Sequence, residues 1–402
     1  MTVDASPAQL PIAAPEDGRA AWLRRLSITD FRNYARLDLT LDNRPVVLFG
    51  SNGSGKTNIL EAISLLGPGR GIRGAALSEI GRRQPEELEG RAWASSAILV
   101  NSAGDDTRLG VGIERTDTGG FRRVAQRDGR PAGPQELASE IRIVWLTPAM
   151  DRVFAESASE RRKFFDRLVM AHAPEHGAVA AAYERAMKAR QRLLDEDRRD
   201  RAWLEALETE MASHGVALAA ARLEVLGRLQ TAIDARGDGP FPQADLALEG
   251  ALEAALAEGR TAGEIEDEFI KTLANVRPRD AAAGRALDGP HRSDVKARHR
   301  AKNMPAEQCS TGEQKAILVA VTLANARALG PGGLGLNGRA NPLLLLDEAG
   351  AHFDDKRRAA LYNELAILPG QAWLTGADES LFESFAGAAQ FIEVSDGKIR
   401  PI

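Results

Sequence analysis

The segment GSNGSGKT, Gly50 to Thr57, decides the fold of this 402-residue chain. It fits the pattern G-x-x-x-x-G-K-[ST] at every position. A short apolar run, RPVVLF at 44–49, leads into it as a predicted strand, and Ile59 and Ile63 follow at the spacing of one helix face. Strand, glycine-rich loop and helix in this order are the context that a phosphate-binding loop requires. We therefore predict that the chain binds a nucleoside triphosphate.

The residue types of this loop match the chemistry of a triphosphate. Glycines let backbone N–H groups curl around the phosphates, and the N-terminus of the following helix adds its positive dipole end. Lys56 would reach the β and γ phosphates, and the Thr57 hydroxyl would face Mg²⁺. The alternative is a chance glycine-rich turn, which the flanking strand and helix argue against. The predicted nucleotide-binding residues of the loop are Gly50, Ser51, Asn52, Gly53, Ser54, Gly55, Lys56 and Thr57.

A second segment, PLLLLDEAGAHFD at 342–354, supplies acids at the end of an aliphatic run. Four leucines predict a fully buried parallel strand, and ligands bind at the carboxyl ends of such strands. Asp347 would hold Mg²⁺ directly or through water, and Glu348 would orient or deprotonate an attacking water. The alternative is a strand that ends in solvated acids. We predict Glu348 and Lys56 as the catalytic pair.

A third segment, CSTGEQKA at 309–316, precedes the apolar helix predicted for KAILVAVTLANARAL. A helix N-terminus attracts anions, Ser310 adds a hydroxyl, and Gly312 permits close approach. The same residues also fit a capping box, with Ser310 and Glu313 satisfying backbone donors. Both functions can hold at once.

The order of these three segments resembles the ABC-type ATPase head. In that family the signature turn of one subunit closes on the ATP of another, which adds Ser310, Gly312 and Gln314 to the predicted nucleotide site. Four further segments resemble the RecF branch, which is related to SMC proteins, and they extend the resemblance over nearly the whole chain after residue 22. They are GSNGSGKTN (50–58), FRNYARLDL (31–39), SASERRKFFDRLV (157–169) and DGPHRSDV (288–295).

The predicted fold is an α/β, SMC-like ABC-type P-loop ATPase head with an inserted helical domain. Residues 1–20 read as a disordered leader and 21–150 as the N-terminal lobe, with hairpins over 85–130. The pattern becomes helical from about 157 to 273, broken by ARGDGPFPQ at 235–243. We therefore predict a helical domain over 151–288 and a C-terminal lobe over 289–402. No heptad register persists, so no long coiled coil is expected.

Composition narrows the class of protein further. No apolar run has the length of a membrane span, and the first twenty residues lack the blocks of a signal peptide. Cys309 is the single cysteine, so no intramolecular disulfide can form, in agreement with a reducing compartment. We expect a cytoplasmic protein without a membrane partner.

The net charge of −5 argues mildly against nucleic acid, but its distribution matters more than its sum. The stretch RSDVKARHRAK at 292–302 carries five basic residues and one acid. Its alternative is a solvated loop face, and His291 and Arg292 could instead be structural. The predicted DNA phosphate contacts are Arg292, Lys296, Arg298, Arg300, Arg70 and Arg73.

The resemblance to RecF proteins implies a role in recombinational repair and replication-fork maintenance, with links to the SOS response. It implies binding of DNA at single-strand gaps and junctions with duplex, an ATP-dependent homodimer, RecR- and RecO-type partners, and loading of RecA recombinase. The expected cofactors are ATP and Mg²⁺, with weak DNA-stimulated hydrolysis. The alternatives are an ABC transporter ATPase subunit and an architectural SMC-like protein.

Three positions depart from the family pattern. Glu313 replaces an amide in the signature turn, Ala351 stands where a serine is expected, and Gly376 occupies the position of the ABC switch histidine. The resemblance then implies slow hydrolysis or a different switch.

Overall fold

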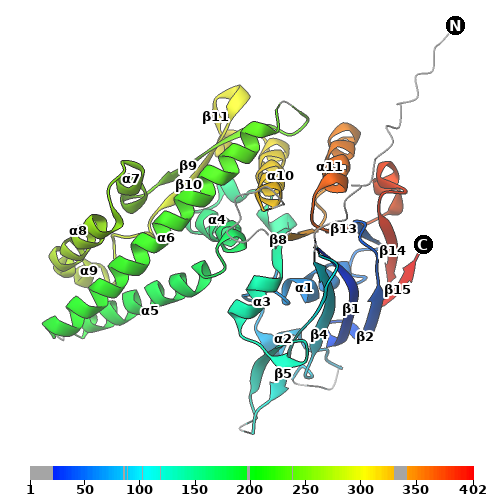
Figure 1. The fold of residues 1–402 in the computed structure, drawn as a ribbon, viewed down its shortest axis with the longest axis horizontal. Helices are drawn as coiled ribbons and strands as arrows, with labels where there is room; N and C mark the ends of the chain where they lie inside the picture. The colour runs from blue at the N-terminus through cyan, green and yellow to red at the C-terminus, as the bar shows by residue number, and fades with distance from the viewer. Residues whose placement is uncertain are drawn as a thin grey trace. The chain divides into compact units, whose positions relative to one another are not determined.

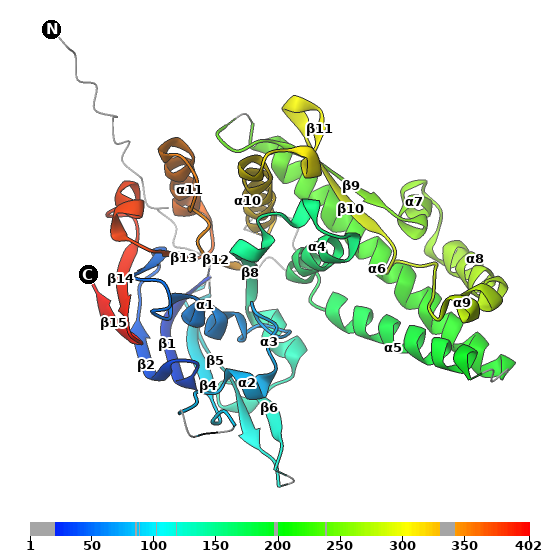
Figure 2. The same cartoon turned by 180° about the vertical axis from the view of Figure 1, so that it is seen from behind.

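The computed structural model describes residues 21–84, 87, 89–101, 103–117, 119–196, 200–237, 239–329 and 342–402. The predicted leader, residues 1–20, lies outside these residues. The chain divides into two compact units, one formed by Met1–Ile141 with Arg339–Ile402 and the other by Arg142–Gly338 (Figures 1 and 2). Sequence-distant segments thus build the first unit together.

An antiparallel sheet in strand order β2-β1-β4-β5-β6-β7 forms one layer of the first unit. Along β1 the side chains alternate after a register shift between Leu23 and Arg25, so that Leu26 and Ile28 are buried while Arg25 faces solvent. The predicted hairpins over 85–130 are confirmed. The strands are β1 (Ala21–Phe31), β2 (Tyr34–Thr40), β4 (Ala94–Asn101), β5 (Asp106–Arg115), β6 (Phe121–Arg127) and β7 (Arg130–Pro131).

A second sheet carries the nucleotide motifs, and its strands from the first unit run in the order β15-β14-β3-β13-β12. Neighbours among β14, β3, β13 and β12 pair in parallel, so their carboxyl ends lie at one edge. The run PLLLL is buried at every position, as predicted. The strands are β3 (Val46–Phe49), β12 (Pro342–Leu346), β13 (Ala372–Gly376), β14 (Gln390–Ser395) and β15 (Lys398–Pro401).

Helix α1 packs between these layers through its apolar face. The buried Ser95 hydroxyl of β4 donates to the Ala62 carbonyl of α1 at 3.0 Å, which ties the antiparallel sheet to the helix that follows the loop. The helices of this unit are α1 (Lys56–Ser64), α2 (Leu77–Ile80), α3 (Pro134–Glu140), α11 (Asp355–Ile367) and the 3-10 helix η5 (Glu379–Phe385).

The second unit is mainly helical. The antiparallel helices α5 and α6 form its longest part (Figure 1) and enclose a core that includes Met211, Leu273 and Phe269. Helix α6 ends at Ala235, where the predicted Gly and Pro break begins. The described residues contain no long coiled coil. The helices are α4 (Ala158–His172), α5 (His176–Asp195), α6 (Arg201–Ala235), α7 (Ala251–Ala257), α8 (Ala262–Asn275), α9 (Arg277–Ala283) and α10 (Thr311–Ala328).

Residues Ala244–Glu249 form a strand, β9, inside the stretch that we expected to be helical. They pair antiparallel with β10 (Asp294–His299), which in turn pairs with β11 (Met304–Pro305). Long-range pairing with a segment fifty residues away overrides the local helical propensity. The remaining short elements are β8 (Arg142–Leu146) and the 3-10 helices η1 (Pro148–Met150), η2 (Val153–Ala155), η3 (Arg300–Lys302) and η4 (Ala306–Gln308).

The division of the chain differs from the one that the sequence predicted. Residues 289–338 were assigned to the C-terminal lobe, but β10, β11 and α10 belong to the same compact unit as the helices. Pairing of β10 with β9 explains this, because it joins the two segments by a ladder of backbone hydrogen bonds. No described helix has the length and apolar content needed to cross a membrane.

Candidate nucleotide-binding site

The glycines of the loop between β3 and α1 are required by its geometry. Gly50 has a φ of 143°, and a Cβ there would lie 2.1 Å from the Val394 carbonyl oxygen. Gly55 has a φ of 116°, and its Cβ would lie 2.6 Å from the Tyr34 hydroxyl. Both positions therefore exclude a side chain by conformation and by space.

The loop is held from outside by a hairpin that sequence reasoning did not include in the site. Asn33 Nδ2 donates to the Ser54 carbonyl at 3.1 Å, and the buried Tyr34 hydroxyl donates to the Gly55 carbonyl at 3.1 Å. The Asn33 amide oxygen in turn accepts from Asn58 Nδ2 at 2.7 Å. The turn in FRNYARLDL thus fixes the loop, and only long-range packing shows this function.

Lys56 lies folded into its own loop. Its Nζ donates to the Gly50 carbonyl at 2.6 Å and to the Ser51 carbonyl at 2.9 Å. Burial lowers the pKa of Lys56, and the carboxylates of Glu348 and Asp347 oppose that shift. The ammonium is thus buried on the backbone of the loop and can exchange these carbonyls for phosphate oxygens.

The ends of β12 and β13 meet the start of α1 at one cluster of oxygens. The Thr57 hydroxyl donates to the Asp347 carboxylate, with distances of 2.9 and 3.1 Å to its two oxygens. Thr375, at the end of β13, donates to Asp347 Oδ1 at 2.7 Å and accepts from the Glu348 backbone N–H at 2.9 Å. Thr375 was missed from sequence, although the carboxyl end of a neighbouring parallel strand was the place to look.

Backbone strain accompanies this cluster at Glu348, which has a φ of 51°. Such left-handed geometry in a residue other than glycine costs free energy and persists only where the surroundings impose it. The bond from the Glu348 N–H to Thr375 supplies that restraint. Its side chain is half-buried beside the cluster.

These residues fit a triphosphate and a divalent cation. The buried Ser54 hydroxyl has no hydrogen-bond partner among the described residues, so the loop holds a polar group with unused capacity. The glycine cradle leaves room for backbone N–H donors to approach an anion. The Thr57 hydroxyl and the Asp347 carboxylate are oxygen ligands of the kind that Mg²⁺ prefers.

The turn before α10 in the second unit forms a complete capping box. The Ser310 N–H and hydroxyl both donate to Glu313 Oε2 at 3.0 Å, and the Glu313 N–H donates to the Ser310 hydroxyl at 3.4 Å. The Lys302 ammonium pairs with the other Glu313 oxygen. The hydrogen bond from Lys302, with those from Ser310, lowers the pKa of Glu313 to about 2.

The three signature residues predicted to contact ATP lie together at this turn. Ser310 and Gly312 are exposed, whereas Gln314 is buried and donates through Nε2 to the Cys309 carbonyl at 2.9 Å. Gln314 Oε1 is buried without a partner among the described residues. The structure thus brings Gly50–Thr57, Asp347 and Glu348 together in the first unit and groups the signature residues separately in the second.

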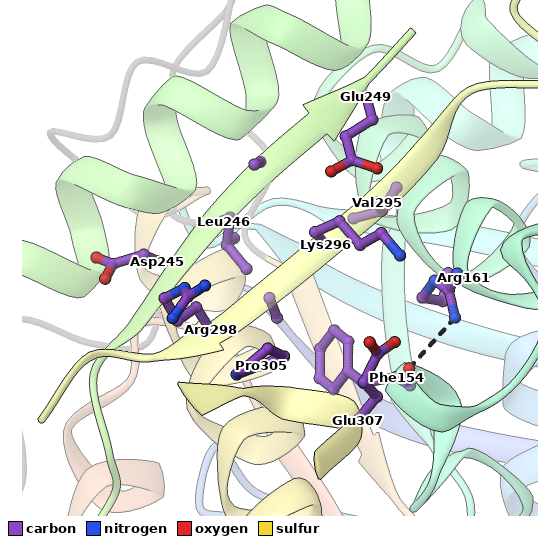
Figure 3. A pocket seen from close by; sticks show the side chains of 12 residues that line it. Phe154, Arg161, Asp245, Leu246, Glu249, Val295, Lys296, Arg298, Pro305 and Glu307 are labelled. Carbon is purple, nitrogen blue, oxygen red and sulfur yellow. Dashed lines mark hydrogen bonds between the residues drawn. The ribbon is translucent and has the colours of Figure 1, made fainter. Parts of the chain in front are cut away.

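Most basic side chains of the 292–302 stretch already form ion pairs within the protein. Arg300 donates to Asp234 at 2.6 Å and to Asp245 at 2.7 Å, and Lys296 pairs with Asp294 at 3.1 Å. Lys296 and Arg298 line a pocket of about 350 Å³, in which acids and bases alternate (Figure 3). The charged lining residues are Arg161, Lys296, Arg298, Asp245, Glu249 and Glu307. Because basic and acidic side chains line the pocket in equal numbers, it is poorly suited to bind nucleic-acid phosphates.

The other three predicted DNA contacts differ among themselves. Arg73 donates at 2.6 Å to both Glu61 and Asn58, so its charge is used inside the first unit. Arg70 and Arg292 are exposed and make no ion pair within the described parts of the chain. Arg292 and Arg70 therefore remain the better candidates of the set.

Two of the segments that resemble RecF proteins contact each other in the second unit. Arg161 donates to both Asp294 oxygens, at 2.8 and 2.6 Å, and Arg162 donates to the Ser293 carbonyl at 2.6 Å. His291 contacts the Tyr183 hydroxyl at 2.8 Å, and burial lowers the pKa of His291. This arrangement favours the structural alternative for His291.

Gly376 ends β13 against an aromatic side chain. A Cβ at this position would lie 2.5 Å from the Phe382 ring. A histidine there would displace Phe382, so the packing accounts for the glycine.

The parallel sheet, its glycine loop and the oxygen cluster at its carboxyl edge define the class of protein, a P-loop ATPase head of the ABC and SMC type. The model of the RecF/RecN/SMC N terminal domain matches residues 22–395. The DNA replication and repair protein RecF of Caulobacter vibrioides is 48% identical over 382 residues, covering 94% of this chain and 97% of its own. That of Rhizobium etli is 47% identical over 379 residues, covering 94% and 98%. The chain belongs to the RecF family.

Solved structures agree on the fold. The recombination mediator protein RecF with ATPrS, of the RecFOR pathway, has a TM-score of 0.80 at 20% identity and covers 96% of this chain and 100% of its own. The Smc head domain of Pyrococcus furiosus has a TM-score of 0.52 at 17% identity, covering 95% and 96%. The predicted fold class and the predicted family are confirmed.

Proposed function

We propose that this protein is an ATP-dependent DNA-binding protein of recombinational repair. The observation that carries the proposal is the cluster of Lys56, Thr57 and Asp347 at the end of the glycine loop. Family membership and the similarity to two RecF structures, one with ATP and one with ATPrS, support ATP as the nucleotide.

Thr57 and Asp347 would hold Mg²⁺, which would neutralise phosphate charge when bound. Lys56 would leave the Gly50 and Ser51 carbonyls for the β and γ phosphates, which are stronger acceptors. Glu348, held by the Thr375 hydroxyl through its backbone N–H, would accept a proton from the attacking water. We expect hydrolysis to be slow, because Gly376 provides no switch histidine.

The signature turn would act on the nucleotide of a second copy of the chain. Exposed Gly312 at the N-terminus of α10 would present its backbone N–H to an anion, and exposed Ser310 would contact the anion in place of Glu313. ATP bound between two subunits would stabilise the homodimer. In the dimer ATP contacts both subunits, whereas in a free subunit it contacts only one, so it binds the dimer more tightly.

The dimer would bind DNA at single-strand gaps and junctions with duplex, mainly through phosphates. The family name supports replication and repair, and the RecFOR pathway of the RecF structures supports RecR- and RecO-type partners. We extend the proposal to loading of RecA, a contribution to the SOS response, and a cytoplasmic location.

The experiment that tests the proposal replaces Lys56 with Ala and follows ATP binding, dimer formation and gapped-DNA binding in parallel. Loss of a charge-assisted contact to phosphate costs about 1.5–3 kcal/mol, or roughly ten- to a hundredfold in affinity. We expect all three activities to weaken together. Lys163→Ala is the control, because Lys163 is exposed and pairs with Glu160 on its own helix.

ATP-dependent dimerisation and DNA binding that survive in K56A would disprove the nucleotide switch. If the wild-type protein binds ATP normally but forms no dimer at any protein concentration, the shared nucleotide site at Ser310 is disproved instead.

A further inference from the structure

The antiparallel sheet of the first unit has a polar outer face that the nucleotide site does not use. Register places Arg25 opposite Ile98 and Ile98 opposite Arg108, so these side chains form one row across β1, β4 and β5. Ser27 lies opposite Ser96 two residues along, hence on the same face. Residues of the opposite parity, such as Leu26 and Leu109, are fully buried.

This face is hollowed into an open pocket of about 210 Å³, which we call the two-arginine pocket. Strands lie about 4.8 Å apart, so Arg25 and Arg108 start roughly 10 Å from each other on either side of Ile98. Such a span fits one tetrahedral anion between two guanidinium groups, with hydroxyls beneath. The pocket is lined by Arg25, Ser27, Ser96, Ala97, Ile98 and Arg108, with no carboxylate among them.

One side of the pocket already holds an oxyanion. The Asp38 carboxylate of β2 accepts from the Ser27 hydroxyl at 2.6 Å, from Arg25 at 3.1 Å and from Arg36 at 2.9 Å. These hydrogen bonds, that of Ser27 first, lower the pKa of Asp38 to about 2. Arg25 and Ser27 are therefore positioned to bind an oxyanion. Their exposed interaction with Asp38 adds little to the folding stability of the protein.

The other side of the pocket lacks such a partner. Arg108 is exposed, and its side chain makes no ion pair or hydrogen bond with any described residue. Of the nearby acids, Asp106 pairs with Arg24 at 2.6 Å, and Asp128 accepts from the backbone N–H of Arg108 at 2.8 Å; neither lines the pocket. Two like charges therefore face one hollow with one of them uncompensated, which favours an anion.

We propose that the two-arginine pocket binds a phosphate group, with Arg108 and Arg25 as the charged ligands and Ser96 as a hydroxyl donor. Guanidinium groups match phosphate oxygens in pairs, and serine completes the donor set. The phosphate belongs either to a nucleic-acid backbone or to a small free phosphate. Binding of free phosphate here does not depend on the function proposed above.

The test compares Arg108→Ala and Arg25→Ala with Arg122→Ala. Arg122 is an exposed arginine of the same sheet that pairs with Glu114, so its loss controls for surface charge. The first arm measures the rise in melting temperature produced by inorganic phosphate, with ATP in excess so that the Gly50–Thr57 loop is filled. The second measures affinity for a gapped duplex against salt concentration.

If the phosphate comes from DNA, R108A and R25A each reduce the slope of log affinity against log salt by about one, and R122A does not. If it is a free phosphate, the same variants lose the phosphate-induced stabilisation and keep the DNA slope. Variants that behave like R122A in both arms overturn the proposal. Unchanged melting of each variant without phosphate shows that the sheet is intact.

Discussion

The N-termini of α1 and α10 use opposite ways of satisfying a helix end. Helix α1 begins after Gly55, which provides no side-chain cap, and the loop before it contains a buried Ser54 hydroxyl that has no partner in the described part of the chain. Helix α10 begins after Ser310, whose donors are all taken by Glu313. The first end is left open for an outside anion, and the second is already occupied by the protein's own carboxylate.

This difference bears on how a shared nucleotide would be recognised. A phosphate at the N-terminus of α1 meets hydrogen-bond donors of the loop and Lys56, which only has to give up its hydrogen bonds to the Gly50 and Ser51 carbonyls. A phosphate at α10 must compete with Glu313 for Ser310, and the carboxylate repels it. Lys302, paired with Glu313, offsets that repulsion in part. We therefore expect the α10 contact to be the weaker half of the site.

The largest effect is expected at the open end. Gly50→Ala places a Cβ 2.1 Å from the Val394 carbonyl oxygen at a φ of 143°, so the loop must move. We expect a loss of several kcal/mol in folding stability and of at least a hundredfold in ATP affinity. Melting temperature and ATP titration measure these two effects.

Gly53→Ala is the matched control, because its φ of 82° is also left-handed but a Cβ there meets nothing within 4 Å. It should show only the conformational cost, about 1–3 kcal/mol at most. Equal losses in G50A and G53A would show that close packing against β14 is irrelevant.

The next effect concerns how the body of α10 is anchored. His172 of α4 is buried, and its Nε2 contacts the Asn325 amide oxygen of α10 at 2.9 Å. Burial lowers the pKa of His172 from 6.5 to about 4. As the pH falls, His172 therefore takes up a proton in the unfolded chain before it does so in the folded chain. The free energy of unfolding consequently decreases as the pH drops from about 6.5 to 4. The loss amounts to about 3 kcal/mol.

Urea unfolding at several pH values measures this dependence. His172→Gln should flatten the dependence between pH 4 and 6.5 relative to the wild type. A wild-type slope retained in H172Q would show that other groups cause the acid sensitivity.

The smallest effect is expected at the capped end. Glu313→Gln removes a negative charge beside Ser310 and leaves Lys302 unpaired, and both changes favour an anion. Because these charges are exposed, we expect the free energy of ATP-dependent dimerisation to become more favourable by about 1 kcal/mol, or roughly fivefold in dimer affinity. Folding stability should fall by less than about 1 kcal/mol.

Helix α8 provides a matched control for this change. Thr261 and Glu264 form the same capping box there, with the Thr261 N–H donating to Glu264 at 3.1 Å. Glu264→Gln should cost a similar amount of stability and leave dimer affinity unchanged. If E313Q and E264Q dimerise equally well with ATP, the charge at Glu313 is not felt by the nucleotide.

Much of the site could be read from local sequence. The glycine loop, its strand and helix, and the acids after PLLLL follow from short patterns, because each function needs particular residue types at fixed spacing. The capping box was equally visible as Ser310 with Glu313 three residues on. Side chains that act through packing, such as Tyr34 and Thr375, carry no such pattern.

The basic stretch shows where sequence reasoning was insufficient. Five bases against one acid predicted a cationic surface, but strand β9 brings Asp245 beside Arg300, and Glu249 and Glu307 join Lys296 around one pocket. The same pairing makes a strand of Ala244–Glu249, which we expected to be helical, and joins residues 289–329 to the helical unit. Charge density along the chain does not predict which opposite charges tertiary structure supplies.

The sequence by itself determined the phosphate loop, the acid-tipped strand, the signature turn and, through their order, the family. Those features depend on backbone conformation and chemistry within a few residues, which local sequence encodes directly. Tertiary structure alone decided how distant side chains support or neutralise these features. Tyr34 holds the phosphate loop, Thr375 holds Asp347, and Asp234 and Asp245 neutralise Arg300 while Arg108 stays exposed on the sheet. These contacts join segments that lie far apart in the sequence, so no local pattern could reveal them.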